Sequence, residues 1–351
     1  MNIKEKTLFV GDLHATNANL DDTSIILDLV QKTLMEDKSI NRIIFLGDIF
    51  HNHSVVKQEI SHYLKRRLIN MHSNVPNVKI YLMAGNHDGT SPHSVKENAV
   101  RLIFEGLEAF NIIVVDQIES GYVSGPFFMV PFIGDNEQFI KTCQANTDKI
   151  LVCHQTVEGA CYENRSLAPG GVKQELIPQH KIISGHIHLQ QSVGKVYYPG
   201  TPRALTSAEY NEDKGIHVYD PEIDLWIRHS TNGLVKCFIR YDIEQGSEYI
   251  DYANEMKEWN TKDDVRMCIH GSEEFYRQTI EKYKYLSERV RFIPDIRSDI
   301  NKKIDVESDG GNVHRSLHKY VHTIYNTDDK TKGKIWKKLQ TLIPNLGNVN
   351  S

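Results

Sequence analysis

The sequence has few cysteines, and none of them forms a recognisable metal or disulfide motif. Five cysteines occur in 351 residues, an odd number without any Cys-X-X-Cys pair. This usage argues against a disulfide framework and against a thiolate zinc site. A reducing compartment is the simplest location, so we expect a cytoplasmic protein.

Long apolar runs and an excess of positive charge are absent as well. No stretch approaches the roughly 18 apolar residues that cross a bilayer. The first ten residues, MNIKEKTLFV, contain no apolar segment of signal-peptide length. We therefore expect no membrane partner. The net charge of −5 gives no overall attraction to nucleic acid, so any DNA contact has to come from local basic patches or from metal ions.

Short β-branched runs alternate with helical patterns over the first 230 residues. This alternation predicts an α/β domain with partly parallel strands. The first strands are expected at residues 7–10, 42–46, 79–83, 149–153 and 181–184, with helices at 25–35 and 55–69. Further strands, expected at residues 127–130, 195–198, 215–219 and 225–229, are closer together and read as a second sheet packed beside the first. We predict a two-sheet α/β sandwich.

The pattern restarts after Thr231-Asn232-Gly233, which indicates a domain boundary. We assign residues 1–232 to the first domain and 233–297 to a small α+β domain. The latter has expected strands at 236–243, 265–270 and 290–296 and helices at 248–259 and 273–286. Residues 298–311 are polar and read as a linker. Residues 312–351 hold seven Lys/Arg against two Asp, and we expect a separate helical segment there that contacts a partner or remains solvated.

Potential metal ligands follow five of the predicted strands of the first domain. The clusters are Asp12-Leu13-His14, Gly47-Asp48, Gly85-Asn86-His87-Asp88, His154 and Gly185-His186-Ile187-His188. Ligands bind outside the carboxyl ends of strands in open α/β sheets, so we expect these clusters to converge on one crevice. Asp12-Leu13-His14 or Gly47-Asp48 alone reads as an ordinary surface turn or loop, and Gly85-Asn86-His87-Asp88 is more specific. Five clusters in this order, each after a strand, predict a metal site.

The types of these side chains indicate which ion they bind. Imidazole and carboxylate without thiolate suit Mn²⁺, with Mg²⁺, Fe²⁺ or Zn²⁺ as alternatives, rather than Ca²⁺. The seven candidate ligands are Asp12, His14, Asp48, Asn86, His154, His186 and His188. Seven side chains are too many for one ion but fit two ions that share a carboxylate. Two ions about 3.5–4 Å apart can activate water and neutralise the oxygens of a phosphoryl displacement, which predicts phosphoester hydrolysis.

The order DxH, GD, GNHD, H and GHxH is similar to the calcineurin-like metallophosphoesterase superfamily, over roughly residues 8–220. The resemblance implies that Asp12, His14, Asp48 and His188 hold one ion and that Asp48, Asn86, His154 and His186 hold the other. It also implies that His87 faces the scissile phosphate and protonates the leaving oxygen, with Asp88 orienting His87.

Within this superfamily the sequence resembles the SbcD-type recombination nucleases. The stretch Gly47-Asp48-Ile49-Phe50-His51 matches their GDxFH form, which implies that His51 helps to place the DNA strand; alternatively, His51 caps the following helix. The stretch from Tyr198 to Pro202, with Glu209 and Lys214-Gly215, is similar to their YxGSP…KG stretch, although it also reads as a tight turn. The signatures of protein Ser/Thr phosphatases, GDxVDRG and GNHE, are missing.

The resemblance implies a Mn²⁺-dependent DNA exonuclease and endonuclease that works with an SbcC-type, SMC-like ATPase. It further implies a homodimer, a DNA-contacting capping domain and a carboxyl-terminal segment that docks on the ATPase. The short tail is similar to compact bacteriophage members, for which the compartment would be the host cytoplasm. The alternatives are a phosphodiesterase or phosphatase acting on a small molecule or a phosphoprotein, and a bridging protein with a vestigial site.

Overall fold

The computed structural model describes residues 5–296, which form two compact units. The first unit comprises residues up to 240 together with 251–265, and the second comprises residues 241–250 and the described residues from 266 onward. No helix between residues 5 and 296 is both long and apolar enough to cross a membrane. The expected linker at 298–311 and the expected segment at 312–351 lie outside the described residues.

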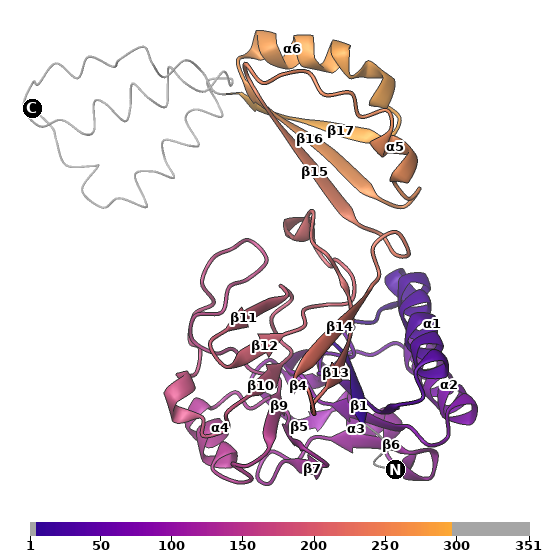
Figure 1. The fold of residues 1–351 in the computed structure, drawn as a ribbon, viewed down its shortest axis with the longest axis vertical. Coiled ribbons are helices and arrows are strands. Elements are labelled where there is room, and N and C mark those ends of the chain that lie inside the picture. The colour runs from indigo at the N-terminus through magenta and orange to yellow at the C-terminus, as the bar shows by residue number, and fades with distance from the viewer. Residues whose placement is uncertain (1–4, 297–351) are drawn as a thin grey trace, which may run out of the picture. The chain divides into compact units, whose positions relative to one another are not determined.

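The first unit is built on two six-stranded sheets, which Figure 1 shows. The strands of the first sheet, in spatial order, are β14 (Leu225–Ser230), β13 (Gly215–Asp220), β1 (Lys6–Val10), β2 (Ile40–Phe45), β3 (Lys79–Met83) and β6 (Ile112–Val115). Strands β1, β2, β3 and β6 run parallel, whereas β13 and β14 are antiparallel to their neighbours. The parallel strands therefore end at the same edge of the sheet.

The second sheet repeats this arrangement. Its strands, in spatial order, are β11 (Gln191–Val193), β12 (Val196–Tyr198), β10 (Ile182–Ser184), β9 (Ile150–Cys153), β8 (Phe127–Val130) and β7 (Tyr122–Ser124). Strands β8, β9, β10 and β12 are parallel. A short hairpin of β4 (Gly89–Ser91) and β5 (Ser94–Asn98) follows β3 and belongs to neither sheet.

The placement of β13 and β14 corrects the expectation that they belong to the second sheet. Strand β13 pairs with β1, so that Leu8 lies opposite Val218. Every residue of β13 is buried, because Val218 packs in the helix-covered core of the first sheet while Tyr219 faces the core between the sheets. Alternating burial identifies a strand in the sequence, but it does not identify the neighbouring strand.

The first unit has four layers, helices, sheet, sheet and helix, with an apolar core between each adjacent pair. Helices α1 (Leu20–Glu36), α2 (Gln58–Asn74) and α3 (Ala99–Phe104) cover the outer face of the first sheet, and α4 (Asn136–Cys143) covers that of the second. The core between the sheets contains Phe9, Ile44, Phe127 and Val152. The two-sheet α/β sandwich expected from the sequence is confirmed. Its inner faces bring the carboxyl ends of both sets of parallel strands together.

The second unit contains most of a three-stranded sheet in the order β15 (Phe238–Glu244), β16 (Asp264–Gly271), β17 (Val290–Ile296), together with helix α6 (Glu273–Lys282). The expected helix at 248–259 is wrong over most of its length, since α5 covers only Glu255–Glu258. The Asp251 side chain accepts a hydrogen bond from the backbone N–H of Ala253 at 3.0 Å. Such a local turn competes with helix formation.

Candidate metal centre

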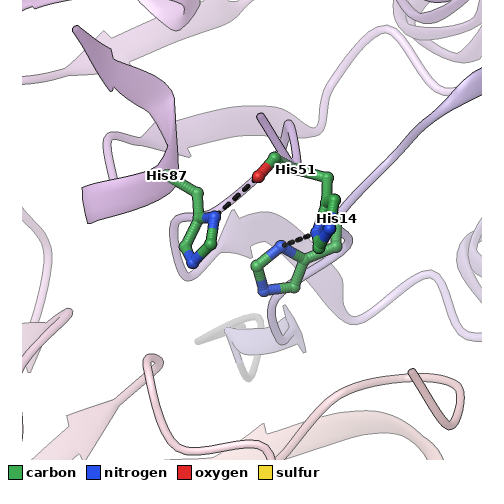
Figure 2. A group of neighbouring side chains, drawn as sticks. All are labelled: His14, His51 and His87. Carbon is green, nitrogen blue, oxygen red and sulfur yellow. Dashed lines mark hydrogen bonds between the residues drawn. The ribbon is translucent and has the colours of Figure 1, made fainter. Parts of the chain in front are cut away.

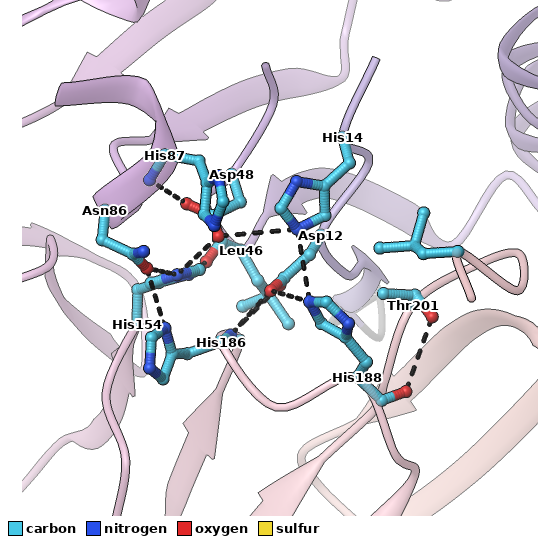
Figure 3. A network of polar contacts seen from close by, with 12 residues as sticks. Asp12, His14, Leu46, Asp48, Asn86, His87, His154, His186, His188 and Thr201 are labelled. Carbon is cyan, nitrogen blue, oxygen red and sulfur yellow. Dashed lines mark hydrogen bonds and ion pairs between the residues drawn. The ribbon is translucent and has the colours of Figure 1, made fainter. Parts of the chain in front are cut away.

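All seven predicted ligands lie in loops that follow the carboxyl ends of parallel strands, and the structure brings them together (Figure 3). Asp12 and His14 follow β1, Asp48 follows β2 and Asn86 follows β3. The second sheet supplies His154 after β9, and His186 and His188 after β10. The backbone N–H of His14 donates to the carbonyl oxygen of Asp48 at 2.8 Å, so the first two loops are tied directly to each other.

One group of ligand atoms consists of Asp12, His14 and His188, whose candidate ligand atoms all lie within 4.8 Å of one another. The Nε2 atoms of His14 and His188 are 3.2 Å apart. Asp48 Oδ2 lies 3.6 Å from Nε2 of His14, and Asp12 Oδ2 lies 3.9 Å from Nε2 of His188. These four side chains offer two imidazole nitrogens and two carboxylates to one position.

A second group consists of Asp48, His154 and His186, with Asn86 between the two imidazoles. Asn86 Oδ1 lies 3.0 Å from Nε2 of His154 and 2.8 Å from Nδ1 of His186. Asp48 Oδ2 lies 3.3 Å from Nε2 of His154. Asp48 thus contacts both groups, as a shared ligand of two ions would.

The first two loops and the loop after β10 hold their ligands in an unusual backbone conformation. The φ angles of His14, Asp48 and His186 are 43°, 48° and 75°. This left-handed region is unfavourable for residues other than glycine, and such residues cluster at functional sites. The unfavourable φ angles of these three candidate ligands indicate that the contacts of their side chains, rather than local backbone preference, determine the conformation of the loops.

A glycine makes the close packing of the centre possible. A Cβ atom on Gly85 would overlap the carboxylate of Asp48 and lie 2.8 Å from Cε1 of His154. Only a residue without a side chain leaves both groups where they are. The glycine of the Gly-Asn-His-Asp sequence is therefore required by the packing of the centre.

Burial and mutual proximity shift the pKa values of the ligands. Burial, together with the neighbouring Asp48, raises the pKa of Asp12 to about 6. Burial opposes a charge on His154, but Asp48 and Asp12 raise its pKa to about 9. Burial and the nearby His154 lower the pKa of His186 to about 3. The buried carboxylates of Asp48 and Asp12 thus stabilise a positive charge on His154, and divalent cations bound among these groups would supply that positive charge instead.

The donor set fits two divalent cations. His154 Nδ1 donates to the carbonyl oxygen of Leu46 at 2.7 Å, which turns Nε2 toward Asp48 and Asn86. Metal-binding histidines commonly donate their other ring N–H in this way. Carboxylate, amide and imidazole donors without thiolate are those of hard or borderline metal ions.

His87 and His51 lie beside the first group of ligands (Figure 2). His87 Nδ1 is 2.6 Å from the backbone oxygen of His51, and His51 Nδ1 is 3.2 Å from Nδ1 of His14. Because a carbonyl oxygen only accepts, Nδ1 of His87 carries a proton. The alternative that His51 caps the next helix is wrong, since α2 begins at Gln58 with Lys57 as its N-cap.

Asp88 is placed differently from the expected contact with His87. Its carboxylate accepts backbone N–H bonds from Ile49 at 3.2 Å, Phe50 at 2.9 Å and Gly85 at 2.9 Å. Burial and the neighbouring Asp48 raise its pKa to about 7. Asp88 therefore joins the loops after β2 and β3, and the carbonyl group of His51 is the group that contacts the imidazole of His87.

A buried ionic network supports the loop that carries His188. Lys214 is 4% exposed, and its Nζ lies 2.6 Å from Glu209 Oε2 and 2.9 Å from Glu212 Oε2. The same ammonium group donates to the backbone oxygen of His188 at 3.0 Å and to Thr201 Oγ1 at 3.1 Å. The Tyr-Pro-Gly-Thr-Pro and Lys-Gly stretches meet here, where they contact the backbone of His188 rather than its imidazole ring.

Sequence reasoning missed Arg203. This residue is 6% exposed, and its Nη2 donates to the backbone oxygen of His14 at 3.0 Å. Arg203 follows the Tyr-Pro-Gly-Thr-Pro stretch directly, and its position after that stretch is the only signal in the sequence that could have indicated it. Arg203 holds the loop that carries His14, as Lys214 holds the loop that carries His188.

A family model for calcineurin-like phosphoesterases matches residues 5–228. The chain belongs to this family of metal-dependent phosphoesterases. It is similar to exonuclease subunit 1 of Enterobacteria phage T4, with 22% identity over 341 residues that cover 93% of this chain and 95% of that protein.

Two solved structures match parts of this chain at low identity and with low TM-scores. One is described as a novel archaeal phosphodiesterase, with 15% identity, a TM-score of 0.35, and coverage of 64% of this chain and 99% of that one. The other is the nuclease MPE of Pseudomonas putida, with 16% identity, a TM-score of 0.27, and coverage of 54% of this chain and 66% of that one.

Proposed function

We propose that this protein is a Mn²⁺-dependent DNA exonuclease and endonuclease that hydrolyses phosphodiesters in DNA recombination, repair or replication. The observation that carries the proposal is the convergence of seven donor side chains in two groups that share Asp48. The similarity to a phage exonuclease subunit over 93% of the chain supports DNA as the substrate.

In this proposal, Asp12, His14, Asp48 and His188 hold one ion, and Asp48, Asn86, His154 and His186 hold the other. Two ions held by these residues would supply an activated water molecule and positive charge for the attacking and leaving oxygens. The chain holds its imidazoles in the required orientation through backbone carbonyl groups and neighbouring rings, as the contact between His154 and Leu46 illustrates.

His87 would supply a proton to the leaving oxygen. Its Nδ1 proton is fixed on the carbonyl oxygen of His51, so the proton available for transfer sits on Nε2. The ring centroid of His87 lies 4.7 Å from that of His14, beside the first group of ligands. A protonated imidazole at this position stabilises the charge of a phosphodiester and then protonates the departing alkoxide.

The partner and domain assignments complete the proposal. Residues 233–297 would form a capping domain that contacts DNA, and residues 312–351 would dock on an SbcC-type, SMC-like ATPase, with residues 298–311 as the linker. A homodimer formed through the first domain belongs to the same proposal. The full-length similarity to a protein whose name includes the word subunit supports a complex.

The test measures hydrolysis of linear duplex DNA and of nucleotide monoesters by the full chain, with Mn²⁺ or with EDTA. We expect Mn²⁺-dependent cleavage of DNA, little release of phosphate from monoesters, and loss of cleavage in Asn86→Ala and His87→Ala. Cleavage that persists in EDTA or in Asn86→Ala would contradict the assignment of the site. Efficient hydrolysis of monoesters without cleavage of DNA would contradict the substrate.

A further inference from the structure

A cavity of about 360 Å³ lies next to the candidate metal centre, within the first unit. It is lined by the chain that leads into α1 and by the segment between β2 and α2. The lining includes Thr16, Asn17, His51, Asn52, Val56 and Lys57. The roles proposed above for the seven ligands and His87 do not use this cavity.

His51 lines the cavity and also lies beside the metal centre. The His51 ring contacts His14 at 3.2 Å, and its backbone oxygen contacts His87 at 2.6 Å (Figure 2). Thr16 lies two residues after His14 in the same loop. A phosphodiester bound between the ligands and His87 would therefore direct one of its two ester substituents toward the cavity.

The chemistry of the lining is mixed, as a nucleoside requires. Val55, Val56 and Ile60 offer aliphatic surface, and the amides of Asn17 and Asn52 offer donors and acceptors. Asparagine amides pair with the edges of nucleobases, and aliphatic side chains pack against the faces of the bases. Asn17 is already held, because its amide nitrogen donates to Glu59. Lys57 supplies one ammonium group, which suits the next phosphate of a strand.

The size of the cavity limits its occupant. Its volume lies at the lower end of the roughly 300–1,000 Å³ found for ligand sites. A single nucleoside fits a cavity of this size. The side chains of His51, Asn52 and Lys57 are exposed, so the cavity is open to solvent and a strand can enter it without passing through the protein.

We propose that this cavity binds the nucleoside on one side of the scissile phosphodiester. This proposal rests on the proposed function and names the part of the DNA that the site recognises. His51 would link the cavity to the metal centre. Its side chain lines the cavity, and its backbone oxygen accepts the Nδ1 proton of His87.

The test compares two chromogenic diesters that differ only in one substituent. Thymidine 5′-(p-nitrophenyl) phosphate carries a nucleoside, and methyl p-nitrophenyl phosphate carries a methyl group. Both are assayed with the full chain in Mn²⁺. The variant Val56→Trp fills the cavity, Asn52→Ala removes one exposed amide, and Val123→Trp places the same bulk on exposed β7 as a control.

We expect Val56→Trp to lower kcat/KM for the thymidine diester roughly tenfold more than for the methyl diester. We expect Asn52→Ala to raise KM for the thymidine diester with little change in kcat, and Val123→Trp to match the wild type on both substrates. Equal losses on both diesters in the two cavity variants would overturn the nucleoside site while leaving phosphodiester hydrolysis intact. A wild-type protein that hydrolyses neither diester and does not cleave duplex DNA in Mn²⁺ would instead overturn the proposed function.

Discussion

At the scale of single residues, the candidate centre depends on side chains that bind no metal. Lys214 contacts the backbone oxygen of His188, and two carboxylates surround its ammonium group. A buried charge costs several kcal/mol unless it is paired and hydrogen-bonded. Here the three protons of the ammonium group are offered to four acceptors, so Lys214 contributes to stability and positions one candidate ligand.

We predict that Lys214→Met lowers the free energy of unfolding by about 3 kcal/mol or more, because it leaves Glu209 buried without its cation and leaves Glu212 with only the exposed Arg165. Urea denaturation measures this change. The matched control is Lys32→Met, since Lys32 is 68% exposed and pairs with Glu36 across one turn of α1. Its loss should change stability by less than about 1 kcal/mol.

A second measurement separates positioning from stability. Mn²⁺ titration of folded Lys214→Met should show weaker binding at one of the two sites, because the loop of His188 loses its anchor. Equal stability and equal Mn²⁺ binding in Lys214→Met and Lys32→Met would contradict the role of Lys214.

At the scale of elements, one histidine connects all three strands of the second unit. His270 on β16 contacts Asp242 on β15 at 2.7 Å and Asp295 on β17 at 2.8 Å. Hydrogen bonds that the imidazole donates to Asp295 and Asp242 raise the pKa of His270, and Glu244 adds to the effect while burial opposes it. A protonated His270 can donate to both carboxylates, whereas the neutral ring can donate to only one.

We predict that this unit is more stable below the ordinary histidine pKa of about 6.5 than at higher pH. The folded pKa lies above the unfolded value, so the contribution is complete at low pH and is lost as the pH rises through the folded pKa. Solvent screening keeps the effect below about 1 kcal/mol.

Urea unfolding of the full chain at pH 6.0 and pH 8.5 tests this prediction. His270→Asn should reduce the difference between the two pH values, whereas His229→Asn on β14 should leave it unchanged. A difference that is the same in the wild type and in His270→Asn would contradict the assignment.

The elements also show how far the sequence predicts the fold. Strand β3 lies at 79–83 and β8 at 127–130, as expected, because continuous apolar runs are the signature of buried parallel strands. The pairing of β13 with β1 could not be predicted, since strand periodicity does not specify the neighbour. The short elements β4 and β5 were missed because their polar sequences carry no periodic apolar pattern.

The candidate site was predictable to the same extent. Side chains that could bind metal were visible in the sequence because each follows a strand. The contacts behind them were not visible, since Asp88 and Lys214 act through backbone atoms of distant loops. Sequence spacing gives no information about which carbonyl group a buried side chain reaches.

At the scale of the whole molecule, the overall charge of −5 gives no general attraction to a polyanion, so binding depends on local positive charge such as that of the metal centre. Two divalent cations would add +4 at a site whose own carboxylates are buried. The same cations would bind the folded chain and not the unfolded chain, because only the folded chain brings the strand ends of both sheets together. Metal binding is therefore coupled to the stability of the fold.

We predict that Mn²⁺ raises the thermal midpoint of unfolding relative to EDTA. At a free concentration of about 100 times Kd, each site adds about 2.7 kcal/mol, which corresponds to roughly 5–10 °C for a unit of this size. Calorimetry of the full chain measures the shift. Asp48→Asn should remove most of it, because Asp48 contacts both groups of ligands, whereas Asp148→Asn, on the exposed chain before β9, should retain it. An equal midpoint in Mn²⁺ and EDTA for the wild type would mean that the seven side chains bind no metal ions. The proposed hydrolysis would then lose its physical basis.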